Sequence, residues 1–107
     1  MPFGSIATVY YVTFYHSDPA ADPSTGDRLI ETYPRHRAYL DEFAEGGQVW
    51  MIGTFDQPVM NGSMAIFRSR EGAEEFLAHD PFVTEGLVYR FELREWNALE
   101  FPGPPAT

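Results

Sequence analysis

The stretch IATVYYVTFY, residues Ile6–Tyr15, decides the fold. It is dense in β-branched and aromatic residues and contains neither glycine nor proline, which is typical of a β-strand covered on both faces. We therefore predict a central strand here. The next stretch, His16 to Asp27, supplies prolines, a glycine and short polar side chains without periodicity, so it is predicted to be a loop.

Further segments show the periodicity of regular structure. They are a helix from Pro34 to Glu45, strands over Gln48–Thr54 and Ser63–Arg68, a helix capped by Ser69 that runs to about His79, and a strand over Leu87–Trp96. Helical turns from Asp27 to Thr32 would be kinked at Pro34. Gly46-Gly47 ends the first helix, because glycine takes the left-handed conformation without a Cβ penalty.

The resulting order, β-α-β-β-α-β, predicts an α+β domain of the ferredoxin-like type, with an antiparallel four-stranded sheet and two helices on one face. The other face would expose apolar side chains of the first two strands. Because twofold dimers are the commonest soluble oligomers, we expect a homodimer that buries these faces as a dimeric α+β barrel. Residues 1–96 form this domain, and 97–107 form a proline-rich C-terminal tail.

Composition narrows the class of protein. The chain has 107 residues, enough for one core, and a formal net charge of −9. This charge disfavours nucleic acids and anionic membranes, which both require clustered Lys and Arg. There are no cysteines, so thiolate nucleophiles and cysteine-based metal sites are excluded. The N-terminus lacks the pattern of a signal peptide, so we expect a cytoplasmic protein.

A histidine interrupts the apolar stripe of the first predicted helix. The stripe has helical spacing and consists of Leu29, Tyr33, His36, Leu40 and Phe43. A titratable ring on such a face needs a polar partner. His36 is therefore either a functional residue or a structural one that bonds a carbonyl or a water molecule.

Short motifs in three segments resemble the YCII-related (YciI-like) family of small dimeric α+β barrel proteins, over about residues 6 to 96. They are Pro34-Arg35-His36 with Ala38-Tyr39-Leu40 after it, Gly62-Ser63, and Asp80-Pro81-Phe82-Val83 followed by Gly86-Leu87. The resemblance implies an active site formed by His36 and Asp80. Tyr33 replaces an arginine that the family often has, so a cationic anchor for substrate would have to come from Arg28, Arg35 or Arg37.

A carboxylate bonded to one imidazole nitrogen fixes the tautomer and leaves the other nitrogen free to exchange a proton. The His36–Asp80 pair would thus suit proton abstraction beside a carbonyl, isomerisation or elimination. Thr54 and Ser63, at strand ends, are candidates to orient a substrate oxygen, although such residues often only complete hairpins. No G-x-S-x-G elbow surrounds Ser63, which disfavours a nucleophilic triad.

Three hypotheses for function follow. The first is a cofactor-independent lyase or isomerase acting on a small organic molecule, because the resemblance implies a dehydrochlorinase among relatives. The second is a non-catalytic small-ligand-binding or regulatory dimer. In the third, His36 and Asp80 only hold the fold together. We expect no cofactor, because the sequence has no phosphate-binding glycine motif, and no metal, because the histidines are dispersed.

Overall fold

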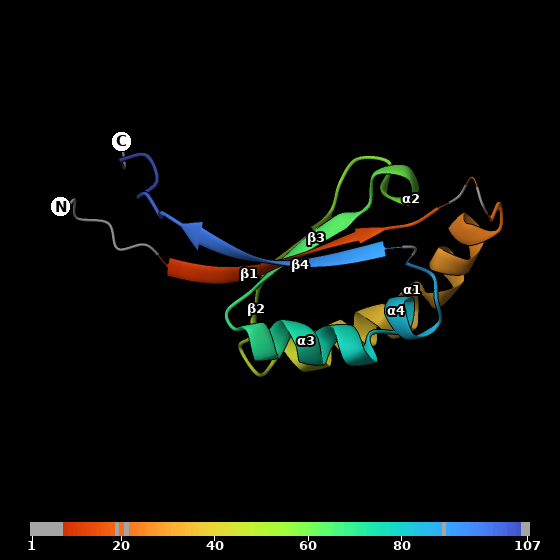
Figure 1. Cartoon of the computed structure of the whole chain (residues 1–107), viewed down its shortest axis with the longest axis horizontal. Helices are drawn as coiled ribbons and strands as arrows, with labels where there is room; N and C mark the ends of the chain where they lie inside the picture. The colour runs from red at the N-terminus through yellow and green to blue at the C-terminus, as the bar shows by residue number, and fades with distance from the viewer. Residues whose placement is uncertain (1–7, 19, 21, 89, 106–107) are drawn as a thin grey trace.

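An antiparallel sheet with helices packed on one face makes up the fold (Figure 1). The computed structural model describes residues 8–18, 20, 22–88 and 90–105. Its elements are β1 (Thr8–His16), α1 (Thr25–Ala44), β2 (Val49–Thr54), α2 (Pro58–Asn61), β3 (Ser63–Phe67), α3 (Arg70–His79), α4 (Pro81–Thr84) and β4 (Arg90–Ala98). None of the described helices is long and apolar enough to cross a membrane.

The sheet has four strands in the order β2-β3-β1-β4, and every neighbouring pair is antiparallel. β1 is a central strand, paired with β3 on one side and along its whole length with β4 on the other. The predicted α+β fold and the central position of the first strand are therefore confirmed. Ile6, with which the predicted strand began, lies outside the described residues.

The core lies between the sheet and α1 and α3. Its buried side chains come from β1, β3 and α3, and they are Tyr15, Ala65, Phe67, Ala73, Phe76 and Leu77. Phe67 and Phe76 are almost fully buried, with ring centroids 5.4 Å apart. Because aromatic side chains bury the largest apolar areas, this pair contributes strongly to the packing of α3 on the sheet.

The first helix is longer than the sequence predicted. It begins at Thr25, within the predicted loop, and continues through Pro34. A proline inside a helix removes the hydrogen bond to the carbonyl four residues earlier, here that of Ile30. Ile30 is 73% exposed, so water can take the place of the missing donor at this point. The extra turns extend α1 along the same face that carries His36.

Two connections also differ from the prediction. The turn between β2 and β3 contains the short helix α2, and β4 runs from Arg90 to Ala98 rather than from Leu87 to Trp96. The backbone N–H groups of Leu87 and Val88 donate to the carbonyl of Phe82 at α4, so they are not available to the sheet. At its other end, β4 includes the first two residues assigned to the tail.

The face of the sheet away from α1 and α3 is apolar. Tyr10, Val12 and Ile66 lie on it, with the ring of Trp50 stacked on Tyr10 at 4.8 Å. Pairing places Trp96 opposite Tyr10, so this side chain is on the same face, and it is 44% exposed. The predicted apolar face is thus present, and α1, α3 and α4 all lie on the other side of the sheet (Figure 1).

Candidate active site

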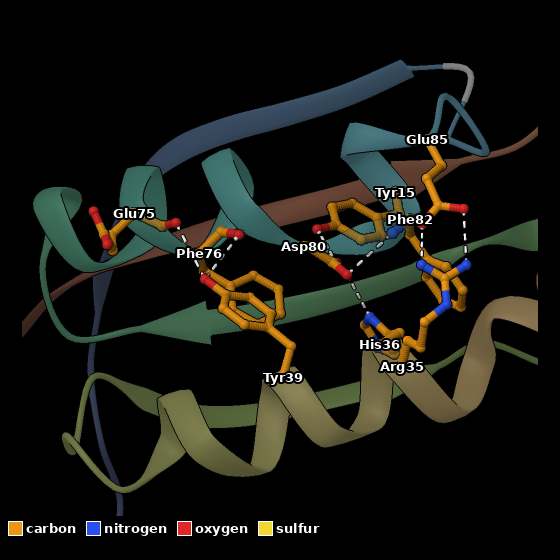
Figure 2. Close-up of polar contacts among 9 residues, drawn as sticks. All are labelled: Tyr15, Arg35, His36, Tyr39, Glu75, Phe76, Asp80, Phe82 and Glu85. Carbon is orange, nitrogen blue, oxygen red and sulfur yellow. Dashed lines mark hydrogen bonds and ion pairs between the residues drawn. The ribbon is translucent and has the colours of Figure 1, made fainter.

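Two elements that are distant in sequence bring His36 and Asp80 together (Figure 2). His36 points from α1 toward the junction of α3 and α4, where Asp80 lies in extended backbone between the two helices. Asp80 is the N-cap of α4, because its Oδ1 accepts a hydrogen bond from the backbone N–H of Phe82 at 3.2 Å. The cap fixes the carboxylate relative to the helices.

The imidazole and the carboxylate form a close, buried pair. Nδ1 of His36 lies 2.7 Å from Oδ1 of Asp80. The Asp80 side chain is fully buried, and that of His36 is 9% exposed. An ionised carboxylate only accepts hydrogen bonds, so in that state Nδ1 of the imidazole carries the proton. The unprotonated lone pair of a neutral ring is then on Nε2.

Tyr15 is a third member of this cluster, and the sequence did not single it out. Its hydroxyl donates to the second carboxylate oxygen of Asp80, Oδ2, at 2.6 Å. Burial raises the pKa of Tyr15 far above its usual value, and the charge of Asp80 and its hydrogen bond raise it further. The hydroxyl therefore keeps its proton throughout the physiological range and is a permanent donor to Asp80.

Aromatic rings hold the plane of the imidazole. The ring of Phe82 is stacked on that of His36, with centroids 4.1 Å apart and planes inclined by 7°. Phe76 meets the same imidazole edge-on, with a centroid separation of 6.4 Å. Rotation of His36 about its side-chain bonds would lose both contacts and the bond to Asp80. The packing thus fixes which nitrogen faces which neighbour.

Nε2 of His36 is open to a cavity of about 730 Å³ between α1 and the sheet. Among the described residues this nitrogen makes no hydrogen bond, yet no buried side-chain nitrogen or oxygen is left unpaired there, so it is accessible. The cavity is lined mainly by apolar and aromatic residues, among them Leu29, Ile30, Tyr33, Leu40, Ile52 and Phe82. A cavity of this size and character can accommodate a small organic molecule.

The predicted site residues fall into two groups. His36, Thr54 and Ser63 line the cavity, while Asp80 lies behind the imidazole and does not. Arg35 is also outside it: its guanidinium forms a two-point ion pair with Glu85, with Nη2 2.9 Å from Oε1. This pair lowers the pKa of the Glu85 carboxyl and raises that of Arg35 through hydrogen bonding.

The other two arginine candidates, Arg28 and Arg37, differ in whether they line the cavity. Arg28 forms an ion pair with Asp22 at 3.2 Å and does not line the cavity. Arg37 does line it, half-exposed, with Nε donating to Asp41 at 2.9 Å. Of the three cationic candidates, only Arg37 is therefore within reach of a molecule in the cavity, and its charge is already paired.

A metal centre is not evident in the part of the chain that the structure describes, because no three His, Asp or Glu side chains gather there. The polar groups at the cavity are instead the imidazole, several hydroxyls and the Arg37–Asp41 pair. Such a set can bind and orient oxygen substituents and exchange a proton through Nε2 of His36.

Comparisons with known proteins agree with this architecture. One similar solved structure is 5-chloro-2-hydroxyhydroquinone dehydrochlorinase (TftG) from Burkholderia phenoliruptrix AC1100, in complex with 2,5-dihydroxybenzoquinone. The two chains share 23% identity with a TM-score of 0.63, over 82% of this chain and 93% of the other. This likeness supports the fold. No curated protein sequence gives a significant match.

A comparison with models of protein families assigns this chain to a family. The model of the YCII-related domain matches residues 9–97, from the second residue of β1 to the last but one of β4. The match includes all the elements that surround the cavity, as well as His36 and Asp80. This chain therefore belongs to the YCII-related domain family.

Proposed function

We propose that the protein is a cofactor-independent enzyme of the lyase or isomerase type, in which His36 is the general base and acid for a small organic substrate. One observation carries this proposal: Nδ1 of His36 is bound to a fully buried carboxylate, while Nε2 opens into a cavity. An imidazole that only joined two helices would need the bond at Nδ1 but would not need an unpaired Nε2 at an open cavity.

A dehydrochlorination is the reaction we favour, since a structural relative is named for that activity. Nε2 of His36 removes a proton from carbon or oxygen of the substrate. The electron pair left behind forms a new double bond, and chloride leaves with the electrons of the carbon–chlorine bond, so the net change is loss of HCl. Asp80 stabilises the imidazolium formed, and positioned proton transfer of this kind typically contributes ~10²- to 10⁴-fold.

Substrate binding in this proposal relies on the cavity wall. Thr54 ends β2 and Ser63 begins β3, and the two are register partners that both line the cavity. We propose that they bind an oxygen substituent of the substrate. Arg35 is not included, because Glu85 already binds its guanidinium away from the cavity.

A panel of chlorinated hydroquinones and small carbonyl compounds tests the proposal, with release of chloride and the change in ultraviolet absorbance as readouts. We expect turnover that His36→Ala and Asp80→Asn both abolish. His79→Ala is the matched control, since this imidazole lies exposed on α3 and bonds only within its own helix.

Equal turnover in wild type and in both site variants would contradict the proposal. A compound that raises the melting temperature of the wild type but is recovered chemically unchanged would instead favour the ligand-binding or regulatory alternative. Comparing both readouts for each compound separates the two functions.

We further propose that the protein is a homodimer formed through the uncovered face of the sheet. Met51 is 52% exposed on that face and Trp96 is 44% exposed, beside the buried Tyr10 and Val12. Contiguous apolar surface of this kind marks interaction sites. A cytoplasmic location stays a prediction from the sequence.

A further inference from the structure

Tyr15 is the one member of the buried cluster to which the proposed reaction assigns no task. Its hydroxyl lies 2.6 Å from Oδ2 of Asp80, on the side of the carboxylate opposite to His36 (Figure 2). We propose that Tyr15 is a positioning residue, whose hydroxyl holds the Asp80 carboxylate in the rotation that places Oδ1 at Nδ1 of His36. The expected change in kcat rests on the proposed function, whereas the expected change in the hydrogen bond between His36 and Asp80 does not.

The division of donors between the two carboxylate oxygens supports this role. Oδ1 receives both the imidazole N–H and the backbone N–H of Phe82, whereas Oδ2 receives only the Tyr15 hydroxyl among the described residues. Asp80 is fully buried, so bulk water cannot replace that donor. Without the hydroxyl, the carboxylate would turn about its Cβ–Cγ bond to share its donors, because a buried charge without hydrogen bonds is costly.

Strand pairing and a close neighbour fix the backbone of Tyr15 in the sheet. It lies on the central strand β1, where Ser63 and Phe91 are its register partners on the two sides. Gly62 approaches so closely that a Cβ at this position would lie 2.0 Å from the carbonyl oxygen of Tyr15. The hydroxyl thus extends from the central strand of the sheet to the helix junction, and it ties the orientation of Asp80 to the sheet.

The hydroxyl also shares the negative charge of Asp80. Two donors on one carboxylate weaken each other, because each draws electron density from the same group. A more acidic phenol at position 15 should therefore weaken the hydrogen bond from His36, and removing the Tyr15 donor should lengthen that bond, because the carboxylate then turns away from Nδ1. A residue that merely filled space beside Asp80 would have neither effect.

The test uses the proton on Nδ1 of His36, observed by NMR in ¹⁵N-labelled full-length protein. We expect Tyr15→Phe to move this resonance upfield, because the hydrogen bond from Nδ1 lengthens as the carboxylate turns. Site-specific 3-fluorotyrosine at position 15, which keeps the hydroxyl and is a stronger donor, should move it upfield. Tyr39→Phe is the control: within the described part of the chain that hydroxyl bonds only the backbone carbonyls of Glu75 and Phe76, so the resonance should stay in place.

Kinetics supply the second readout. With any substrate that the wild type turns over, we expect Tyr15→Phe to lower kcat ~10-fold and leave KM unchanged, because misorientation affects the proton transfer more than binding. If Tyr15→Phe does not fold, the fluorotyrosine protein decides. A resonance that moves in neither Tyr15 protein would overturn the inference, even in an active enzyme. Upfield shifts in both Tyr15 proteins, in a protein without activity, would support the inference and would count only against the proposed function.

Discussion

Oδ1 of Asp80 lies 2.7 Å from Nδ1 of His36, and the same oxygen caps α4 by accepting the N–H of Phe82. This one oxygen atom thus caps the first turn of α4 and also fixes the tautomer of His36, which faces the cavity. Because the two roles share one carboxylate, substitutions at position 80 will affect stability and activity together.

Asp80→Ala should lower the free energy of unfolding by about 2–4 kcal/mol. It removes a helix cap, worth about 1 kcal/mol, and leaves the buried donors of Tyr15 and His36 without an acceptor, at about 1–3 kcal/mol. Urea denaturation followed by circular dichroism measures the change. Asp41→Ala, which removes an exposed carboxylate of α1, should stay within about 0.5 kcal/mol of wild type. Equal stability of the two variants would contradict the proposed roles of Asp80.

The stability of wild type should fall with rising pH above about 10, and Tyr15 should account for part of this fall. Its pKa is raised on folding, mainly by burial, so the folded state keeps a proton that the unfolded chain loses above its ordinary pKa of about 10. The free energy of unfolding then decreases by up to about 1.4 kcal/mol per pH unit for this one group. Below pH 10 both states hold the proton and the effect vanishes.

Denaturation curves at several pH values check this linkage by comparing wild type with Tyr15→Phe. The variant is less stable at neutral pH, and the two curves should converge above pH 10. Tyr39→Phe provides a second comparison, since burial raises the pKa of Tyr39 to about 12, so its contribution stops growing near that pH. Parallel curves for wild type and Tyr15→Phe would rule out the effect.

The fold was predictable because its elements have strong local patterns. Residues Ile6–Tyr15 carry strand composition, and Gly46-Gly47 marks the end of α1, so the order of elements and the sheet could be inferred without tertiary information. The start of α1 could not, because Thr25 and Pro34 are locally unfavourable to a continuous helix and only packing and exposure make it tolerable. The same holds for Leu87 and Val88, which bond back to Phe82.

The site was predictable only in part. His36 stood out because it interrupts an apolar stripe, and Asp80 came from the resemblance rather than from any local pattern. Tyr15 and Asp80 are 65 residues apart, so nothing near either residue indicates their hydrogen bond. Arg35 is a similar case, since its partner Glu85 is 50 residues away. The one available signal was that a tyrosine on the inner face of a central strand needs a partner for its hydroxyl.

Gly62→Ala should destabilise the protein and disturb the site. Gly62 has a φ of 84°, which side chains rarely adopt, and an added Cβ would lie 2.0 Å from the carbonyl oxygen of Tyr15. Backbone atoms on both sides of that contact cannot rotate away, so β1 and the α2–β3 turn must separate. We expect a loss of about 1–3 kcal/mol, read from urea denaturation.

Gly103→Ala is the matched control for that variant, because it lies in the C-terminal segment and, among the described residues other than its chain neighbours, no heavy atom lies within 4 Å of the added Cβ. Its stability should match that of wild type. If Gly62→Ala is equally stable, the close approach of the turn to Tyr15 is not a constraint on the fold.

Met51→Glu should convert the proposed homodimer into monomers. Met51 pairs with Ile66 and lies on the uncovered face of the sheet, 52% exposed, so a carboxylate there would be buried against apolar surface on association. The repulsion and the desolvation of two symmetry-related charges both oppose the dimer. Sedimentation velocity should show the mass of two chains for wild type and of one for the variant. Ala78→Glu, at an exposed alanine of α3, introduces the same charge on the opposite side of the sheet and should remain dimeric. A wild type that sediments as a monomer at micromolar concentration would contradict the proposed dimer, and so would a dimer that persists in Met51→Glu.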